Sequence, residues 1–198
     1  MLNILEDLKI KRSKLIIGDA SFRKFYRVKY KNKKSIFIYC TKNKNTNLKK
    51  YSNINKFLKK NFLIVPKTFE INIRKNFMII EDFGTKSYLD ILKKKNNKFL
   101  IYKKLVDEII KIQEIPFQQC KEITKFYSIK SLIKECDLFF KWYLPIIFKT
   151  KKVIFIQNKI KKLFYPLLKE LSFPNQYLVH RDFHVSNLIS IKKKSWNY

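Results

Sequence analysis

The hydrophobic period of this chain changes once, near Gly84, and that change constrains its fold more than any other feature. Before residue 84, most apolar runs have the length of β-strands and are bounded by polar turns. These runs are residues 14–18, 25–30, 35–40, 67–73 and 77–81. Two segments there have helical spacing instead, residues 2–12 and 47–60. The order predicts a five-stranded antiparallel sheet with one helix between its third and fourth strands.

After Gly84 the apolar residues recur every three or four positions, which predicts helices. The helical segments are residues 86–94, 98–113, 128–143 and 154–171. Pro145 is expected to end the third helix, and Pro166 to loosen the fourth. Two short apolar runs near the C-terminus, residues 176–179 and 188–191, are predicted to be strands on either side of a polar loop.

These patterns together predict an α+β fold made of two lobes. Residues 1–83 would form the lobe with the sheet, and residues 84–198 a helical lobe. A short hinge near residues 81–85 would join them. Periodicity alone does not distinguish this plan from those of other α+β proteins.

The formal charge of +30 suggests a nucleic-acid partner, but the composition favours another interpretation. Of the 45 basic residues, 40 are lysine, and Lys, Ile, Phe, Asn and Tyr together make up 113 of the 198 residues. A genome rich in A and T favours this set. A nucleic-acid binder would be expected to use arginine and to gather its charge, whereas lysine is spread along this chain. We therefore expect weak, non-specific binding of polyanions and no specific nucleic-acid partner. A basic nucleic-acid-binding protein stays an alternative.

The cysteines and the apolar runs indicate a cytoplasmic protein. Cys40, Cys120 and Cys136 are odd in number and are not spaced as metal ligands, which is typical of a reducing compartment. No apolar run approaches the roughly 18 residues of a membrane span. The N-terminus lacks the basic-then-apolar order of a signal peptide.

The segment that indicates chemistry is residues 179–189, which contains the pattern H-R-D-x-x-x-x-N. This is the catalytic-loop pattern of phosphoryl-transfer enzymes, and it arises by chance in such a chain only about 0.0001 times. In that chemistry Asp182 would be the catalytic base that accepts the proton of the attacking hydroxyl. Asn187 would hold a Mg²⁺ ion on the phosphates, and His180 would hold the loop in shape. His184 is a second histidine in the loop and could also be only a hydrogen-bonding group of it.

With this loop, the chain resembles the aminoglycoside phosphotransferase and choline-kinase-like superfamily, within a protein-kinase-like two-lobed fold. It is most similar to the bacterial kinases that phosphorylate the amino sugars N-acetylmuramate and N-acetylglucosamine. Besides the loop, the resembling segments are residues 18–28, 65–66, 78–84 and 135–144. The resemblance implies the cofactors ATP and Mg²⁺ and a small-molecule substrate. It also implies nucleotide-binding residues, namely Ser21, Phe22, Ile80, Glu81 and Phe83.

Four departures from the family pattern bear on activity. The chain has no G-x-G-x-x-G loop, Tyr39 stands where the phosphate-binding lysine would be, and residues 47–60 contain no glutamate. The fourth is that no acidic residue follows Asn187, although these kinases use a further aspartate to bind Mg²⁺. The expectation is a C-terminally truncated kinase with an incomplete helical lobe and little or no activity of its own. A catalytically inactive remnant and half of a split kinase are the alternatives, and a separately encoded C-terminal fragment is a candidate partner.

Overall fold

The computed structural model describes residues 2–16, 23–41, 45–121, 123–125, 127–171 and 177–191. Two compact units make up the chain. Met1–Ile115 and Val179–Tyr198 form the first, here called the sheet unit, and Pro116–Leu178 form the second, the helical unit. The predicted lobe boundary at residues 83 and 84 stays a prediction.

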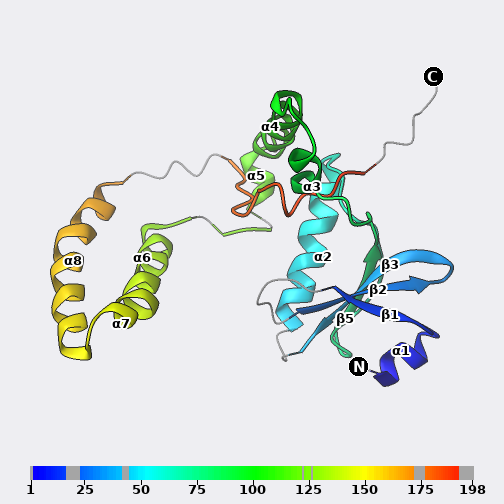
Figure 1. The fold of residues 1–198 in the computed structure, drawn as a ribbon, viewed down its shortest axis with the longest axis horizontal. Coiled ribbons are helices and arrows are strands. Elements are labelled where there is room, and N and C mark those ends of the chain that lie inside the picture. Colours follow the sequence, from blue (N-terminus) through cyan, green and yellow to red (C-terminus); the bar gives the residue numbers. More distant parts are fainter. Residues whose placement is uncertain are drawn as a thin grey trace. The chain divides into compact units, whose positions relative to one another are not determined.

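Strands and helices follow one another in the order predicted up to residue 81 (Figure 1). The sheet unit contains α1 (Leu2–Asp7), β1 (Ser13–Ile16), β2 (Arg23–Tyr30), β3 (Lys33–Cys40), α2 (Asn45–Lys60), β4 (Thr68–Asn72), β5 (Phe77–Glu81), α3 (Tyr88–Lys93) and α4 (Phe99–Gln113). The helical unit contains α5 (Phe117–Cys120), α6 (Ile129–Leu138), the π-helical turn η1 (Phe139–Tyr143), α7 (Leu144–Ile147) and α8 (Thr150–Glu170). No helix in the described part of the chain is both long enough and apolar enough to cross a membrane.

The five strands form one antiparallel sheet in the order β1-β2-β3-β5-β4, which confirms the α+β class and the five-stranded sheet. The two-residue turn Lys31–Asn32 joins β2 to β3. Both residues have positive φ, 44° and 61°, as a type I′ hairpin requires. The second predicted hairpin, β4 with β5, is also present, and its turn covers residues 73–76.

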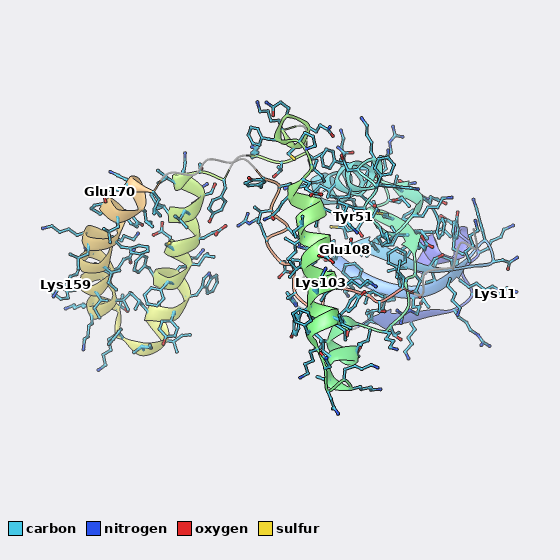
Figure 2. The ribbon with its side chains drawn as sticks, turned by 90° about the horizontal axis from the view of Figure 1, so that it is seen from above. Lys11, Tyr51, Lys103, Glu108, Lys159 and Glu170 are labelled. Carbon is cyan, nitrogen blue, oxygen red and sulfur yellow. The ribbon has the colours of Figure 1, made fainter. Side chains whose placement is uncertain are left out.

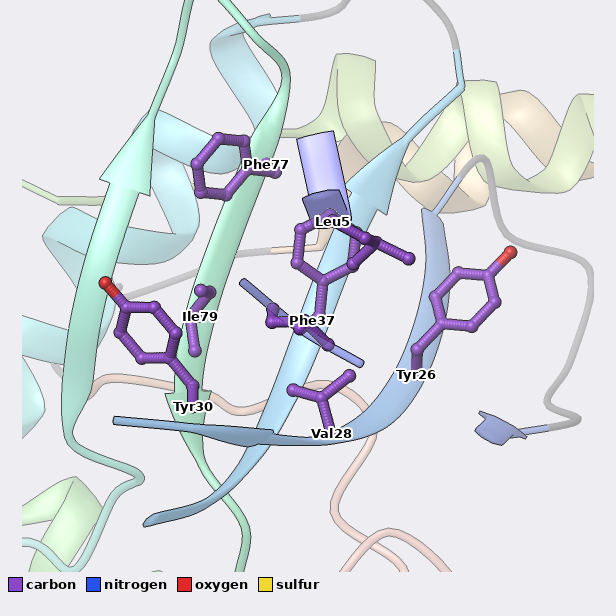
Figure 3. Close-up of a cluster of buried hydrophobic side chains, with 8 residues drawn as sticks. Leu5, Tyr26, Val28, Tyr30, Phe37, Phe77 and Ile79 are labelled. Carbon is purple, nitrogen blue, oxygen red and sulfur yellow. The ribbon is translucent and has the colours of Figure 1, made fainter. Parts of the chain in front are cut away.

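Both faces of the sheet are covered, each by one of the two helices predicted in this part of the chain. Phe37, Phe77 and Ile79 point to one face, where they pack with Leu5 of α1 (Figure 3). Neighbouring residues point to the other face, because side chains alternate along a strand. These residues, Ile36, Ile38, Met78 and Ile80, pack with Leu48 of α2. Burial from two sides explains why the third and fifth strands are continuous apolar runs in the sequence.

The helical unit pairs the segment from α6 to α7 with α8. Phe140, Leu144 and Val153 form its buried cluster. The helix does not end at Pro145 as predicted. Instead η1 precedes the proline, and the Leu144 N–H donates to the Phe139 carbonyl five residues back. Because proline has no N–H and its ring crowds the carbonyl four residues before it, the wider π turn lets the helix continue to Ile147.

The strands predicted around the C-terminal loop do not form as expected. Residues 177–179 have no strand structure, and Gln176 lies outside the described residues. Of residues 188–191, only Ile189 forms an isolated antiparallel bridge, with Ser87. The prediction treated residues 176–179 and 188–191 as regular strands on either side of one loop. The second run pairs instead with a segment about 100 residues earlier in the chain.

Candidate active site

The loop with the H-R-D-x-x-x-x-N pattern lies against the start of α3. Three main-chain hydrogen bonds hold it there. Tyr88 N donates to Leu188 O at 2.9 Å, Leu89 N donates to Val185 O at 3.1 Å, and Ser190 N donates to Lys86 O at 2.8 Å. Because residues 86–89 follow directly on β5 and its exit, the loop is fixed next to the point where the chain leaves the sheet.

The α3 end of this contact is itself well formed. Ser87 caps α3 by accepting a hydrogen bond from Asp90 N at 3.1 Å, and the Asp90 carboxylate accepts one from Ser87 N at 3.1 Å. This is a capping box. The hydrogen bonds from Ser87 hold the pKa of Asp90 below its usual value. The start of α3, to which the loop is hydrogen-bonded, is therefore itself held by side-chain as well as main-chain contacts.

The loop turns tightly enough to bring residues five positions apart together. Arg181 has a φ of 70°, a left-handed conformation that reverses the chain just before Asp182. His184 N then donates to Asp182 O at 3.2 Å, and Asn187 N donates to His184 O at 2.9 Å. The spacing of the motif thus places Asp182 and Asn187 on one side of the loop.

The Asp182 carboxylate is the centre of the side-chain contacts. Asn187 Nδ2 donates to its Oδ2 at 2.6 Å, and His184 Nε2 lies 3.3 Å from its Oδ1. His184 Nδ1 in turn lies 3.1 Å from Ser186 Oγ. The Asp182 side chain is 72% exposed, so a substrate or an ion can reach it. An exposed carboxylate beside an amide and an imidazole can accept a proton from a hydroxyl or bind a cation.

His180 lies at the start of the loop, and its contacts are local. Its Nδ1 accepts a hydrogen bond from Asp182 N at 3.4 Å, and its ring meets Phe183 edge-on with the centroids 5.5 Å apart. These contacts hold the main chain on both sides of Arg181. They are of the kind expected for a residue that holds the loop in shape.

The residues expected to bind the nucleotide have different surroundings. Ile80 is 6% exposed and packs in the cluster against α2, so its side chain is part of the core. The Glu81 carboxylate accepts a hydrogen bond from Lys67 N at 3.1 Å. Phe83 is half-buried, and no other described residue hydrogen-bonds to its main chain. Ser21 and Phe22 lie outside the described residues.

Sequence reasoning missed a contact between the sheet and the exit from β5. Arg27 of β2 binds the Asp82 carboxylate through Nε at 2.6 Å and Nη2 at 3.2 Å. The two partners are 55 residues apart, so no local pattern could reveal the pair. One signal was present: Arg27 is one of only five arginines in a chain with 40 lysines. An arginine in such a chain indicates a place where a planar, two-pronged donor is needed.

The charges of the sheet unit include a basic groove. Among the 14 residues that line it, eight are cationic: Lys9, Lys11, Arg12, Lys14, Arg27, Lys29, Lys31 and Lys34. Exposed lysines also occur outside this groove, for example Lys103 on α4 and, in the helical unit, Lys159 on α8 (Figure 2). No residue from 179 to 191 lines the groove, so it is separate from the Asp182 loop.

A metal ion at the loop would have few ligands from the described part of the chain. No group of three or more His, Cys, Asp and Glu residues is placed there to hold a metal. Asp182 and Asn187 supply one carboxylate and one amide oxygen. These two hard oxygen donors suit a Mg²⁺ ion that takes its remaining ligands from phosphate and water.

The chain matches no protein-family model and no curated protein.

Proposed function

We propose that this chain is an ATP- and Mg²⁺-dependent phosphotransferase that acts on a hydroxyl group of a small molecule. One observation carries the proposal. The Asp182 carboxylate and the Asn187 amide are 2.6 Å apart, on an exposed loop that is hydrogen-bonded to the exit from β5 of a five-stranded antiparallel sheet. This sheet is compatible with the N-terminal lobe of a kinase-like fold, in which a catalytic loop lies next to the hinge.

Each residue of the proposed site has one task. Asp182 accepts the proton of the attacking hydroxyl, which is why its carboxylate is exposed. Asn187 would hold Mg²⁺, which would supply positive charge to the transferred phosphoryl group. The Phe83 main chain, which binds no other described residue, meets the adenine base.

The substrate class rests on the resemblance of residues 18–28 and 135–144 to amino-sugar kinases. We propose N-acetylmuramate or N-acetylglucosamine as the acceptor. Because the described residues offer Mg²⁺ only one carboxylate at the loop, we expect slow turnover by this chain alone. A separately encoded C-terminal fragment with a further aspartate would raise the rate.

The test is a phosphorylation assay with ATP, Mg²⁺ and the two amino sugars. Asp182→Asn should lower the rate by roughly 10²–10⁴-fold, the usual contribution of a general base. Asp107→Asn is the matched control, because Asp107 is a half-exposed carboxylate on α4 that pairs with Lys103. Equal rates for the parent chain and Asp182→Asn would show that Asp182 is not the catalytic base.

ATP binding gives a second readout that does not need turnover. Asn187→Leu should remove the Mg²⁺ dependence of ATP binding, because the leucine side chain has no oxygen. ATP binding with no turnover would favour the alternative of a catalytically inactive remnant. No ATP binding at all would exclude the proposed function.

The basic groove supports a second candidate function, the binding of polyanions. Eight of its 14 lining residues are cationic, and counterion release from such a surface gives affinity that falls steeply with salt. We expect the binding of single-stranded RNA to be weak, indifferent to sequence and largely lost between 50 and 200 mM salt. Fluorescence anisotropy with RNAs of different sequence measures this. Tight binding of one sequence at physiological salt would instead make nucleic-acid recognition the main function.

A further inference from the structure

Arg27, Asp82 and Gly84 form one hydrogen-bonded group, here called the Arg27 clamp. Arg27 is on β2, whereas Asp82 and Gly84 are on the segment that leaves β5. Besides its two contacts with the Asp82 carboxylate, Arg27 donates from Nη2 to Gly84 O at 2.9 Å. The Asp82 side chain is only 5% exposed, and that of Arg27 is 32% exposed. The clamp is therefore a largely buried ion pair, in which the loss of either partner leaves a charge without compensation.

The clamp holds both main-chain groups of Gly84. Its carbonyl accepts from Arg27, and its N–H donates to Asp82 Oδ1 at 2.8 Å. Gly84 has a φ of +95°, a conformation that residues with a side chain rarely adopt. The chain direction at Gly84 is thus set by two hydrogen bonds and one unusual dihedral angle. A lysine at position 27 would keep the charge but could not make the two-pronged contact.

The position of Gly84 determines where the Asp182 loop lies. Only Thr85 separates Gly84 from residues 86–89, which make the three main-chain hydrogen bonds to the loop. Phe83 lies between the two clamp residues Asp82 and Gly84. The clamp, together with the hydrogen bond from Asp82 N to Lys34 O of β3, therefore fixes both the Phe83 main chain and the start of the segment that binds the loop relative to the sheet.

We propose that Arg27 and Asp82 are positioning residues of the phosphotransfer site. They hold the exit from β5 in place. The adenine of the nucleotide, bound at Phe83, and its terminal phosphate, at Asp182, can then occupy their two sites at the same time. This inference rests on the proposed function, because it assigns a role within the same site. Neither residue touches the substrate, so each acts through Gly84 and the segment that follows it.

The test compares Arg27→Lys with Arg12→Lys, which makes the same exchange at an exposed position of the same unit. Amide hydrogen exchange, at conditions where both variants are folded, should be about tenfold faster in Arg27→Lys at Gly84, Leu89 and Asn187, the increase expected for one lost charge-assisted hydrogen bond. Arg12→Lys should leave these rates unchanged. A pair that served only global stability would speed exchange throughout the sheet, including β3, by the same factor.

The same variants are then assayed with ATP, Mg²⁺ and N-acetylglucosamine. Arg27→Lys should lower kcat about tenfold or more and leave KM for the sugar unchanged, because misplacing the reacting groups slows transfer without removing a sugar contact. If Arg27→Lys does not fold, Gly84→Ala takes its place. The added Cβ would meet nothing within 4 Å, so that variant acts only through the strained φ. It should show the same local exchange and the same loss of kcat.

The outcomes separate the two proposals. If the parent chain binds no ATP, the proposed function fails, and the positioning role fails with it. A second outcome is that the parent chain binds ATP and transfers phosphate, but Arg27→Lys and Gly84→Ala change neither kcat nor the exchange rates at Leu89 and Asn187. That result overturns the positioning role alone. Faster local exchange together with a lower kcat supports it.

Discussion

The sheet unit and the helical unit bury their apolar residues to very different degrees. In the sheet unit Phe37, Met78 and Ile79 are fully buried, with 0% exposure. In the helical unit Ile146 is 82% exposed and Phe155 67% exposed. A strand in the middle of a sheet is covered from both faces, whereas one of two paired helices can bury only the stripe that faces its partner. The apolar residues of β3 and β5 therefore form a closed core, whereas many of those on α7 and α8 lie at the surface.

This difference indicates where the stability of the chain resides. Among the described residues, two clusters of the sheet unit contain 14 buried residues, and one cluster of the helical unit contains three. Apolar burial is the main favourable term in folding. We therefore expect an equal substitution to have a large effect in the first region and a small one in the second, and the following predictions test that contrast.

The largest effect is expected from removing one phenylalanine ring in each region. Phe37→Ala should lower the free energy of unfolding by about 3–5 kcal/mol, because the ring is fully buried and lies 5.5 Å from that of Phe77. Phe155→Ala should change it by no more than about 0.5 kcal/mol, since its side chain is mostly exposed. Urea unfolding followed by circular dichroism measures both. Equal costs would show that the apolar surface of the helical unit is buried in solution.

The sequence predicts the two regions unequally well for the same reason. In the sheet unit, burial on both faces makes β3 and β5 continuous apolar runs, so residues 35–40 and 77–81 indicate their strands correctly. In the helical unit the path past Pro145 depends on the π turn η1, in which Leu144 N donates to Phe139 O. Periodicity assigns a proline to a helix end and has no signal for a π turn.

The candidate site shows the same division between local and distant contacts. The meeting of Asp182 with Asn187 follows from a spacing of five residues, and the sequence motif predicts it. The pairing of Ile189 with Ser87 and of Arg27 with Asp82 joins positions that are far apart in the chain. Such pairs depend on how the elements pack, which local patterns do not contain. The predicted strand at residues 176–179 is wrong because its definition rested on apolar composition without a pairing partner.

A smaller effect is expected at the serines that begin one helix in each unit. Ser87→Ala should cost about 1 kcal/mol, because it removes the capping box at α3. Ser128→Ala should cost about 0.5 kcal/mol. Ser128 Oγ also accepts a hydrogen bond from the main chain, from Ser131 N at 3.2 Å. However, α6 has no acidic residue in its first turn that could accept a hydrogen bond from Ser128 N and complete a capping box. Thermal unfolding of the two variants measures the difference. A larger cost for Ser128→Ala would reverse the ranking of the two units.

The smallest effect concerns the ion pair between α6 and α8. Asp137 binds Lys161 Nζ at 2.8 Å and accepts a hydrogen bond from Tyr165 OH. The hydrogen bond from Lys161 and that from Tyr165 hold the pKa of Asp137 below its usual value. A carboxyl group whose pKa is lower in the folded state adds stability above its ordinary pKa near 4. That stability is lost as the pH falls through the lower, folded value.

We therefore expect acid to weaken the helical unit by less than about 1 kcal/mol between pH 6 and pH 2, since the Asp137 side chain is 40% exposed and solvent screens the pair. Trp142, on η1, reports on this unit when Trp196 is replaced by phenylalanine. Urea unfolding followed by its fluorescence should show a shift of the midpoint with pH, and Asp137→Asn should reduce that shift. Asp107→Asn is the control, because Asp107 is on α4 of the sheet unit. An unchanged shift in Asp137→Asn would mean that the acid sensitivity of the helical unit arises elsewhere than in the pair of Asp137 with Lys161.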